Sequence, residues 1–260
     1  MGLLDDRVAV VTGAGHGIGR VIALALAREG ARTVLAGRSI EALEETAKLA
    51  GELGSNCVVV PTDITVADQV DALARASLEA FGQVDVLVNN SGIGGPSAPL
   101  WEVDPADWAA TMAVNVTGTY LCCRAFVPAM VTRGSGSVVI IGSMTGKRPM
   151  WGRSPYAASK MALVGLTRTL ATEAGPEGVR VNLISPGPVE GERIEWVIER
   201  QAEALGVSVE EARARFMAAS PLGRLVPPED VAAAVVFLAS DRAASITGED
   251  LNLSAGVVMF

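Results

Sequence analysis

Short, continuous apolar runs alternate with longer stretches of helical periodicity along this chain of 260 residues. Strands buried on both faces give unbroken apolar runs, whereas strands with one exposed face alternate apolar and polar residues. Because strand and helix take turns, the pattern predicts an α/β fold, a doubly wound parallel sheet of about seven strands with helices on both faces. The expected strands are Arg7–Thr12, Thr33–Ala36, Cys57–Pro61, Val84–Val88, Ser137–Ile141, Val179–Ile184 and Leu251–Leu253. The expected helices are Ile18–Glu29, Glu41–Leu53, Ala67–Phe81, Ala106–Met130, Tyr156–Glu173 and Glu229–Ala239.

One segment departs from this rhythm. Residues 188–221 are charged, have a helical pattern and stand between a strand and the last helix. We expect one domain over residues 1–260, with 188–221 inserted as a lid. The alternative is a helical pair packed permanently at a subunit interface.

Composition excludes several classes of protein. The net charge of −8 argues against binding nucleic acid or an anionic membrane surface. No apolar run reaches the roughly 18 residues of a membrane span. The three cysteines and single histidine make a metal site improbable. The cysteines are expected to be core residues in a reducing compartment, and the acidic start lacks the basic region of a secretory signal, so we expect a cytoplasmic protein.

A glycine-rich turn follows the first expected strand and opens the first expected helix. It reads TGAGHGIG over residues 12–19. Glycines there allow a tight turn and let the backbone approach a pyrophosphate at the helix N-terminus. The spacing is GxxxGxG, and Ile18 stands where the last glycine of GxGxxG would fall. We interpret the turn as a Rossmann-type dinucleotide site; the alternative is a purely structural turn.

Tyr156 and Lys160 are four residues apart on an expected helix and therefore share a face. A phenol has a pKa of about 10, and moving it to about 7 requires roughly 4 kcal/mol of differential stabilisation. A neighbouring ammonium supplies part of that. Ser143 follows the strand Ser137–Ile141, where its hydroxyl could donate to a carbonyl oxygen. Taken singly, these residues also fit an exposed helix face and an ordinary turn.

Further motifs follow in order along the chain. They are NNSG at residues 89–92, Asn115, Ser143, YAASK at residues 156–160 and Pro186-Gly187. With this set the chain closely resembles the classical short-chain dehydrogenase/reductase family over essentially its whole length. The resemblance implies an NAD(P)-dependent oxidoreductase that interconverts a secondary alcohol and a ketone. It also implies a small-molecule substrate and a homo-oligomer, a tetramer or dimer.

The resemblance also implies residue roles. Tyr156 would be the general acid/base, Lys160 would lower its pKa, and Ser143 would hold the substrate oxygen. Asn115 would anchor a water that links Lys160 to solvent. The implied cofactor contacts are Gly13, Gly15, His16, Gly17, Ile18, Gly19, Arg38, Asp63, Ile64, Asn90, Tyr156, Lys160 and Val189.

The end of the second expected strand bears on the choice of cofactor. A carboxylate there would bind the adenosine 2′-hydroxyl and repel a 2′-phosphate. Residues 35–38 read LAGR, with no carboxylate, and Arg38 is placed to pair with a phosphate. We therefore favour NADP over NAD. An exposed arginine that leads into a helix is the alternative, and His16 adds only weak support.

Gly191 replaces the threonine that the family usually carries after Pro-Gly, and Glu190 and Glu192 flank it. The binding role of this segment stays open. Lys147 and Arg148 would select a carboxylate-bearing substrate or face solvent. Several large side chains would form an apolar pocket of medium size or take part in ordinary packing. They are Met144, Met150, Trp151, Trp101, Trp196 and Phe216.

Two other functions are compatible with the motifs. A 3-oxoacyl-acyl carrier protein reductase belongs to the same family, but its acidic partner would be met by a basic patch, which a net charge of −8 disfavours. A catalytically silent NAD(P)-binding sensor commonly lacks the tyrosine or lysine, and both are present here.

Overall fold

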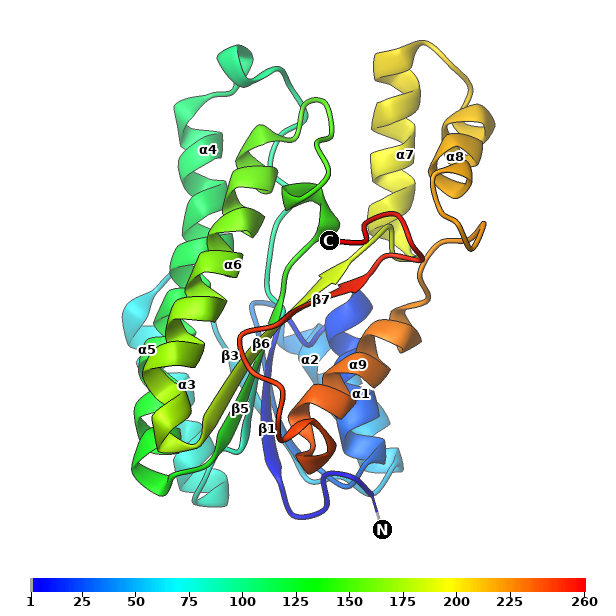
Figure 1. Cartoon of the computed structure of the whole chain (residues 1–260). Helices are drawn as coiled ribbons and strands as arrows, with labels where there is room; N and C mark the ends of the chain where they lie inside the picture. Colours follow the sequence, from blue (N-terminus) through cyan, green and yellow to red (C-terminus); the bar gives the residue numbers. More distant parts are fainter. Residues whose placement is uncertain (1) are drawn as a thin grey trace.

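The computed structural model describes residues 2–260 and contains a seven-stranded sheet in the order β3-β2-β1-β4-β5-β6-β7 (Figure 1). Every neighbouring pair of these strands is parallel, which confirms the predicted α/β fold. The strands are β1 Val8–Thr12, β2 Arg32–Gly37, β3 Cys57–Pro61, β4 Val86–Asn89, β5 Gly136–Ile141, β6 Val179–Pro186 and β7 Asp250–Leu253.

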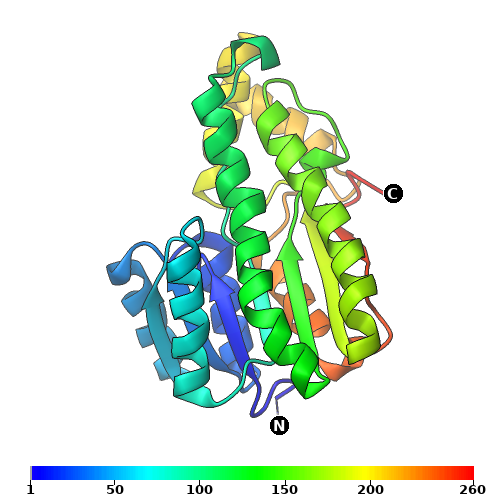
Figure 2. The same cartoon turned by 90° about the vertical axis from the view of Figure 1, so that its left-hand side faces the viewer.

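Helices cover both faces of the sheet. Helices α3, α5 and α6 lie on one face, and α1, α2 and α9 on the other (Figures 1 and 2). The helices are α1 Gly17–Arg28, α2 Ile40–Glu52, α3 Ala67–Phe81, α4 Pro105–Met112, α5 Gly118–Arg133, α6 Ser154–Ala174, α7 Glu192–Leu205, α8 Val209–Ala218 and α9 Pro228–Ala239. Short 3₁₀ turns lie at Leu100–Glu102, Met144–Gly146, Gly175–Glu177 and Asp241–Ala243.

The central strands are apolar throughout because each face of the sheet has its own core. Val8 and Val10 of β1 belong to the core under α3, α5 and α6, whereas Ala9 and Val11 belong to the core under α1 and α9. Successive side chains of a strand point to opposite faces, so both sets are buried. This packing explains the unbroken apolar runs in the sequence.

The strand order reverses between β1 and β4, which places the segments that follow these two strands side by side. The Thr12 hydroxyl accepts hydrogen bonds from the backbone N–H groups of Asn90 (3.0 Å) and Ser91 (3.1 Å). Parallel α/β sheets bind ligands in the crevice at such a reversal. The glycine-rich turn therefore lies at the position where a dinucleotide site is expected.

The helix predicted over Ala106–Met130 is interrupted. Between α4 and α5 the structure has a π-helical turn at Ala113–Thr117, with Asn115 fully buried inside it. A single-turn π insertion shifts the register of the helix by about one residue. The apolar periodicity does not reveal so small a shift, and it therefore predicts one continuous helix.

Residues 188–221 contain α7 and α8, in agreement with their helical pattern. These helices stand above the carboxyl ends of the strands (Figure 1). They share a small apolar cluster of their own, formed by Ile194, Ile198, Ala202 and Ala212 with Leu225 from outside the segment. This cluster is separate from the two cores of the sheet.

Within residues 2–260 no helix is both long and apolar enough to cross a bilayer, and no group of histidine, cysteine or acidic side chains has the arrangement of a metal site. Cys122 and Cys123 are buried in the core, as predicted, and Cys57 is partly buried.

Asp85 at the start of β4 should be a main determinant of stability. Its carboxylate is buried, accepts a hydrogen bond from the Val8 N–H (2.8 Å) and pairs with Arg133 at 3.3 Å. We expect Asp85→Ala to lower the free energy of unfolding by about 2–4 kcal/mol in urea titrations, because a buried donor loses its partner. Asp241→Ala removes an exposed partner of Arg7 and should cost below about 1 kcal/mol. Equal losses in the two variants would contradict this account.

Candidate active site

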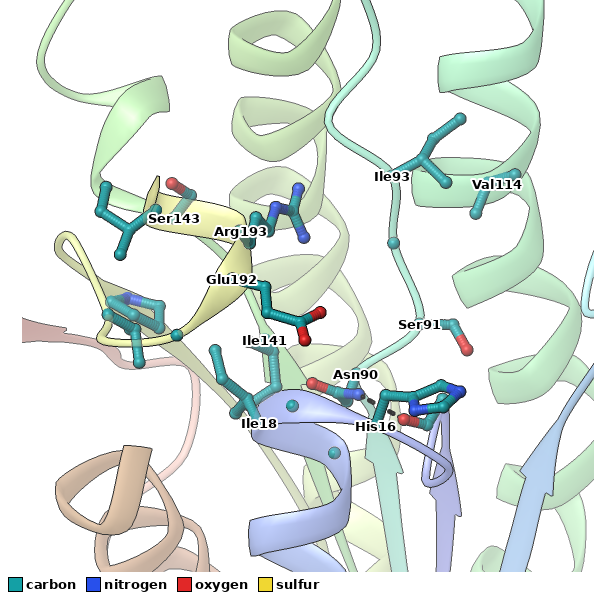
Figure 3. A pocket seen from close by; sticks show the side chains of 18 of the residues that line it. His16, Ile18, Asn90, Ser91, Ile93, Val114, Ile141, Ser143, Glu192 and Arg193 are labelled. Carbon is teal, nitrogen blue, oxygen red and sulfur yellow. Dashed lines mark hydrogen bonds between the residues drawn. The ribbon is translucent and has the colours of Figure 1, made fainter. Parts of the chain in front are cut away.

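A cleft of about 910 Å³ lies at the carboxyl ends of the strands, between the sheet and α7 (Figure 3). Every residue predicted to contact the cofactor lines it, and so does Ser143. Asn115 does not line it and lies buried behind it. The structure thus gathers residues from positions 13 to 189 into one place.

The glycine turn is packed too tightly for any side chain at Gly19. A Cβ atom there would lie 2.0 Å from the Gly13 carbonyl oxygen and 2.5 Å from Nδ2 of Asn90. The Asn90 amide donates to the carbonyl oxygens of Thr12 (3.0 Å) and Gly13 (3.3 Å). Asn90 therefore holds the turn in shape, and the bare backbone at the start of α1 fits a pyrophosphate.

Arg20 is a residue of this turn that the sequence-based prediction did not include. Its Nη2 donates to the Gly15 carbonyl oxygen at 2.6 Å and pairs with Glu45 at 2.6 Å. The side chain thus ties the turn to α2. The sequence signal was available, because this arginine directly follows the glycine run and lies in the first turn of the helix.

Arg38 follows β2 at the other end of the cleft. It is exposed and lines the cleft, and no ion pair within residues 2–260 engages it. Its charge contributes to lowering the pKa of Asp63, after the hydrogen bonds from the side chain and backbone of Thr65. A guanidinium at this position can meet a phosphate, and no carboxylate ends β2.

Tyr156 and Lys160 lie on the first turns of α6, with the Lys160 Nζ 5.7 Å from the centre of the phenol ring. Burial raises the pKa of Tyr156, but the surrounding groups outweigh it, and the net pKa is below its usual value. These groups are the Lys160 ammonium, the Arg193 guanidinium, the Ser143 hydroxyl and the Arg153 guanidinium. The arrangement can hold a phenolate and also a phenol that donates its proton.

Lys160 is itself almost fully buried and donates to the Ile141 carbonyl oxygen at the end of β5 (2.8 Å). Burial lowers the pKa of Lys160, and the negative charge of Tyr156 raises it in return. The hydrogen bond to Ile141 fixes the ammonium under the cleft.

The π turn directs Asn115 toward the same region. Its Nδ2 donates to the Ser159 hydroxyl (2.9 Å) and to the Ile93 carbonyl oxygen (3.0 Å), and its Oδ1 accepts from the Ile93 N–H (2.8 Å). Asn115 therefore joins α6 to the segment after β4. Gly92 in that segment borders both Asn115 and Lys160: a Cβ atom there would be 3.2 Å from the Asn115 Oδ1 and 3.5 Å from the Lys160 Nζ.

Lys147 and Arg148 do not enter the cleft, so neither can select a carboxylate-bearing substrate there. Lys147 pairs with Asp250 at 2.7 Å and donates to Asn252 at 2.6 Å, so its charge is already engaged by β7. Neither selecting a carboxylate nor facing solvent describes it. Arg148 is exposed and lines a smaller cavity of about 280 Å³ beside the cleft.

The predicted apolar pocket is formed by part of the predicted set. Met144, Met150 and Phe216 line the cleft, and Trp151 lines the smaller cavity. Trp101 is 84% exposed and borders neither. Trp196 lies outside the lining, with its ring 5.8 Å from the Arg153 guanidinium carbon. Arg153 and Arg193 both line the cleft and were not among the predicted site residues.

Gly191 has a φ of +129° and a ψ of 177°, a conformation that is essentially restricted to glycine. This residue begins α7, so a threonine here would force a different entry into the helix. Glu192 follows, and Figure 3 shows its carboxylate in the cleft. No ion pair with Arg193 neutralises it among the described residues.

Fold and site together define a dinucleotide-binding oxidoreductase, and comparison with known proteins agrees. A family model described as enoyl-(acyl carrier protein) reductase matches residues 13–258. Galactitol 2-dehydrogenase (L-tagatose-forming) from Cereibacter sphaeroides is 41% identical over 261 residues, covering 99% of this chain and 97% of that protein.

Two solved structures resemble the chain closely. A variant of actinorhodin polyketide ketoreductase with NADPH has a TM-score of 0.94 and 36% identity, covering 100% of both chains. NAD⁺-bound xylitol dehydrogenase has a TM-score of 0.94 and 30% identity, covering 97% of this chain and 99% of that chain. The chain belongs to the short-chain dehydrogenase/reductase family. It is an NAD(P)-dependent oxidoreductase that acts on small alcohols and ketones.

The charge of Lys160 should set the pH dependence of the reaction. With Tyr156 as the general acid/base, alcohol oxidation would require the phenolate, so its rate would rise as pH passes the pKa of Tyr156, whereas ketone reduction would require the phenol and fall there. Lys160→Met removes a charge that lowers this pKa. The rising limb of the kcat/KM profile for oxidation should therefore move to higher pH. Lys48→Met, an exposed position on α2, is the control; if both variants keep the wild-type profile, Lys160 does not act on Tyr156.

Proposed function

We propose that Tyr156 is the general acid/base for the interconversion of a secondary alcohol and a ketone. The observation that carries this proposal is the group of cations around one phenol, with Lys160, Arg193 and Arg153 all lowering its pKa. In oxidation the phenolate takes the hydroxyl proton as a hydride leaves the carbinol carbon. In reduction the phenol donates its proton to the carbonyl oxygen.

The other residues position the reacting groups. When bound, the nicotinamide accepts or supplies the hydride. Ser143 lies at the carboxyl end of β5 beside Tyr156, where its hydroxyl donates to the substrate oxygen and stabilises the negative charge that develops on that oxygen. Lys160 keeps the phenol acidic and reaches toward the cofactor ribose. These roles assign a single substrate oxygen to Ser143 and Tyr156 together.

Asn115 is proposed to hold a water that connects Lys160 with solvent. Both side chains border Gly92, and Asn115 fixes the backbone of that segment through Ile93. A water in this position would pass a proton from solvent to Lys160 and on to Tyr156, which loses one to the substrate in each reduction.

The experiment that tests the function uses Tyr156→Phe. The ring stays and only the hydroxyl is lost, so folding should be little affected. General acid/base catalysis contributes about 10²–10⁴-fold, and we expect turnover to fall by at least that factor while cofactor binding, measured by calorimetry, is retained. A Phe variant that keeps most of its activity on a good substrate would disprove the assignment.

We propose that NADP is the preferred cofactor. Arg38 supports this, because it lines the cleft at the end of β2 with no carboxylate beside it on that strand end. A 2′-phosphate would meet the guanidinium through charge-assisted hydrogen bonds. Asp63 follows the neighbouring β3, and the charge of Arg38 contributes to lowering its pKa, after the hydrogen bonds from Thr65.

The double variant Gly37→Asp, Arg38→Ile should reverse the preference. Hydrogen bonds to charged groups contribute roughly 1.5–3 kcal/mol, so the ratio of kcat/KM values for NADP and NAD should move toward NAD by at least tenfold. Arg28→Ile, on α1, provides a control in which a guanidinium outside the cleft is lost. A wild-type preference for NAD, with Arg38→Ala indifferent to the cofactor, would refute the proposal.

We also propose that residues 188–221 close over the cleft as a lid on the single catalytic domain. Helices α7 and α8 pack on each other through their own apolar cluster, and an ion pair between Glu195 and Arg213 links them. Gly191, with its glycine-only conformation, stands where α7 begins. An anionic diphosphate in the cleft would repel the carboxylate of Glu192, and this repulsion favours movement of the segment when the cofactor binds.

Hydrogen exchange separates a lid from a permanently packed helical pair. Peptides from α7 and α8 should exchange fast in the free protein and become protected when cofactor and a substrate analogue bind. Peptides from α1 and α9 serve as internal controls. Uniformly slow exchange of α7 and α8 in the free protein would leave only the packing role.

A 3-oxoacyl-acyl carrier protein reductase is the second candidate, because a protein of that name from Synechocystis sp. is 36% identical to this chain over 263 residues. The net charge of −8 disfavours an acidic protein partner. A silent sensor is disfavoured by the presence of Tyr156, Lys160, Ser143 and Asn115 in one region.

We infer a homo-oligomer from exposed apolar side chains on neighbouring helices, namely Trp108 on α4, Tyr120 on α5 and Met161 on α6. The cytoplasmic location stays a prediction.

A further inference from the structure

Two guanidinium groups face the catalytic phenol from different segments. Arg153 lies at the residue before α6, and its guanidinium carbon is 5.1 Å from the centre of the Tyr156 ring. Arg193 lies in the first turn of α7, with its guanidinium carbon 5.3 Å from the same centre. Both line the cleft, and Figure 3 shows the Arg193 side chain turned into it.

The two arginines converge on one spot. A Cβ atom at Gly94, in the segment after β4, would lie 3.1 Å from the Arg153 Nη2 and 3.6 Å from the Arg193 Nη2. Two like charges that border the same point repel each other. An anion between them would remove this repulsion and receive hydrogen bonds from both.

Arg153 has no such anion among residues 2–260. Its side chain is buried, with 4% of the residue exposed, and its Nη1 has no hydrogen-bond partner there. No carboxylate of the described residues lies within 4.0 Å of either guanidinium, although ten other ion pairs are present. Burial lowers the pKa of Arg153, the negative charge of Tyr156 raises it, and the charge of Arg193 lowers it. Its neighbours are the rings of Tyr156 and Trp196, which partly compensate a buried cation.

A buried guanidinium without a partner is costly, so this arrangement is expected where a ligand supplies the missing acceptor. The Tyr156 phenolate offers a counter-charge only in one of its two protonation states. Lys147 is not available for a ligand, because Asp250 and Asn252 already engage it. Apolar side chains, including Ile93, Met150, Val197 and Phe216, line the same cleft, together with Ser143 and the carboxylate of Glu192.

We propose that Arg153 and Arg193 bind a carboxylate of the substrate, so that the enzyme interconverts hydroxy acids and keto acids with an apolar body. This inference deepens the proposed function and depends on it, since the carboxylate site adjoins the phenol that acts on the same molecule. The two guanidiniums orient the substrate, and the carbinol carbon is thereby held near Ser143 and Tyr156. Arg193 comes from α7, so closure of this helix completes the carboxylate site.

Binding of a carboxylate by Arg153 and Arg193 should also change the pH profile of oxidation, which a purely structural role of these arginines would not do. Arg193 and Arg153 lower the pKa of Tyr156 when they carry uncompensated charge. A bound carboxylate neutralises part of that charge. The kcat profile for oxidation should therefore rise at higher pH with a hydroxy acid than with a neutral alcohol of the same shape.

The test compares matched pairs of substrates that differ only in charge. The 3-, 4- and 5-hydroxy derivatives of medium-chain acids and their primary amides are assayed with both cofactors. For the best pair, the wild-type enzyme should favour the acid by at least tenfold in kcat/KM. Arg153→Met and Arg193→Met should each lower kcat/KM for the acid by roughly 10- to 100-fold more than for the amide, because any loss caused by a higher pKa of Tyr156 is common to both substrates. Arg153→Lys, which keeps the charge, should recover part of the loss.

Arg148→Met is the matched control, because Arg148 is exposed in the same loop and faces the smaller cavity. It should leave the acid-to-amide ratio unchanged. If Arg153→Met fails to fold by circular dichroism, Arg193→Met decides alone, since that side chain is exposed. Equal losses for acid and amide in the arginine variants would overturn the proposal.

A binding measurement keeps this inference separate from the proposed function. Calorimetry with 4-methylpentanoate and 4-methylpentanamide needs no turnover. The wild-type enzyme should bind the carboxylate at least tenfold more tightly, and Arg153→Met or Arg193→Met should abolish the difference. Equal affinity of the wild type for the two probes overturns the carboxylate site, even if neutral alcohols are turned over. Absence of turnover with every alcohol and ketone contradicts the proposed function, while the binding result still decides this inference.

Discussion

A buried ammonium beside a phenol is the interaction on which the active site depends. Lys160 is 5% exposed, and burial alone would favour its neutral form. If it lost its proton, the largest single force that lowers the pKa of Tyr156 would disappear. The Ile141 carbonyl oxygen accepts a hydrogen bond from Lys160, and the negative charge of Tyr156 raises the pKa of Lys160 against the effect of burial. Each group therefore stabilises the charged form of the other.

The topology of the sheet brings the parts of this site together. β5 ends at Ile141, which holds Lys160, and the chain then passes Ser143 before it enters α6. The reversal between β1 and β4 places the glycine turn against Asn90, and the segment after β4 continues to Ile93, which Asn115 holds. The cofactor end and the chemical end of the cleft are thus two stretches of the same strand edge.

The sequence predicted the local parts of this structure better than the distant pairings. All seven strands and the turn at residues 12–19 could be recognised from the sequence. Burial on both faces requires continuous apolar runs, and the close approach of the backbone in the turn requires glycines. The π turn around Asn115 left no such mark, since it changes the helical register by a single residue. Lys147 was a candidate for substrate recognition, and only the fold shows that Asp250, 103 positions later, engages it.

The proposed carboxylate site also could not be predicted from the sequence. Arg153 stands three residues before Tyr156 but precedes both the predicted helix and α6, so the helical pattern gave no reason to place it beside the phenol. Its convergence with Arg193 depends on how α7 lies over the cleft, and no periodicity records that. Likewise the conformation of Gly191 is a property of the backbone entry into α7. Sequence patterns predict local structure, whereas contacts between residues far apart in the chain can be identified only from the structure.

The chain has only two tyrosines, Tyr120 and Tyr156, which allows a direct measurement of the central claim. Tyrosine labelled with ¹³C at Cζ can be titrated by NMR, and Tyr156→Phe assigns the two resonances. The account predicts that Tyr156 ionises below the ordinary phenol value of about 10 in the wild-type protein and at a higher pH in Lys160→Met. A Tyr156 resonance that titrates at or above 10 in the wild type, or that is indifferent to Lys160→Met, would contradict it.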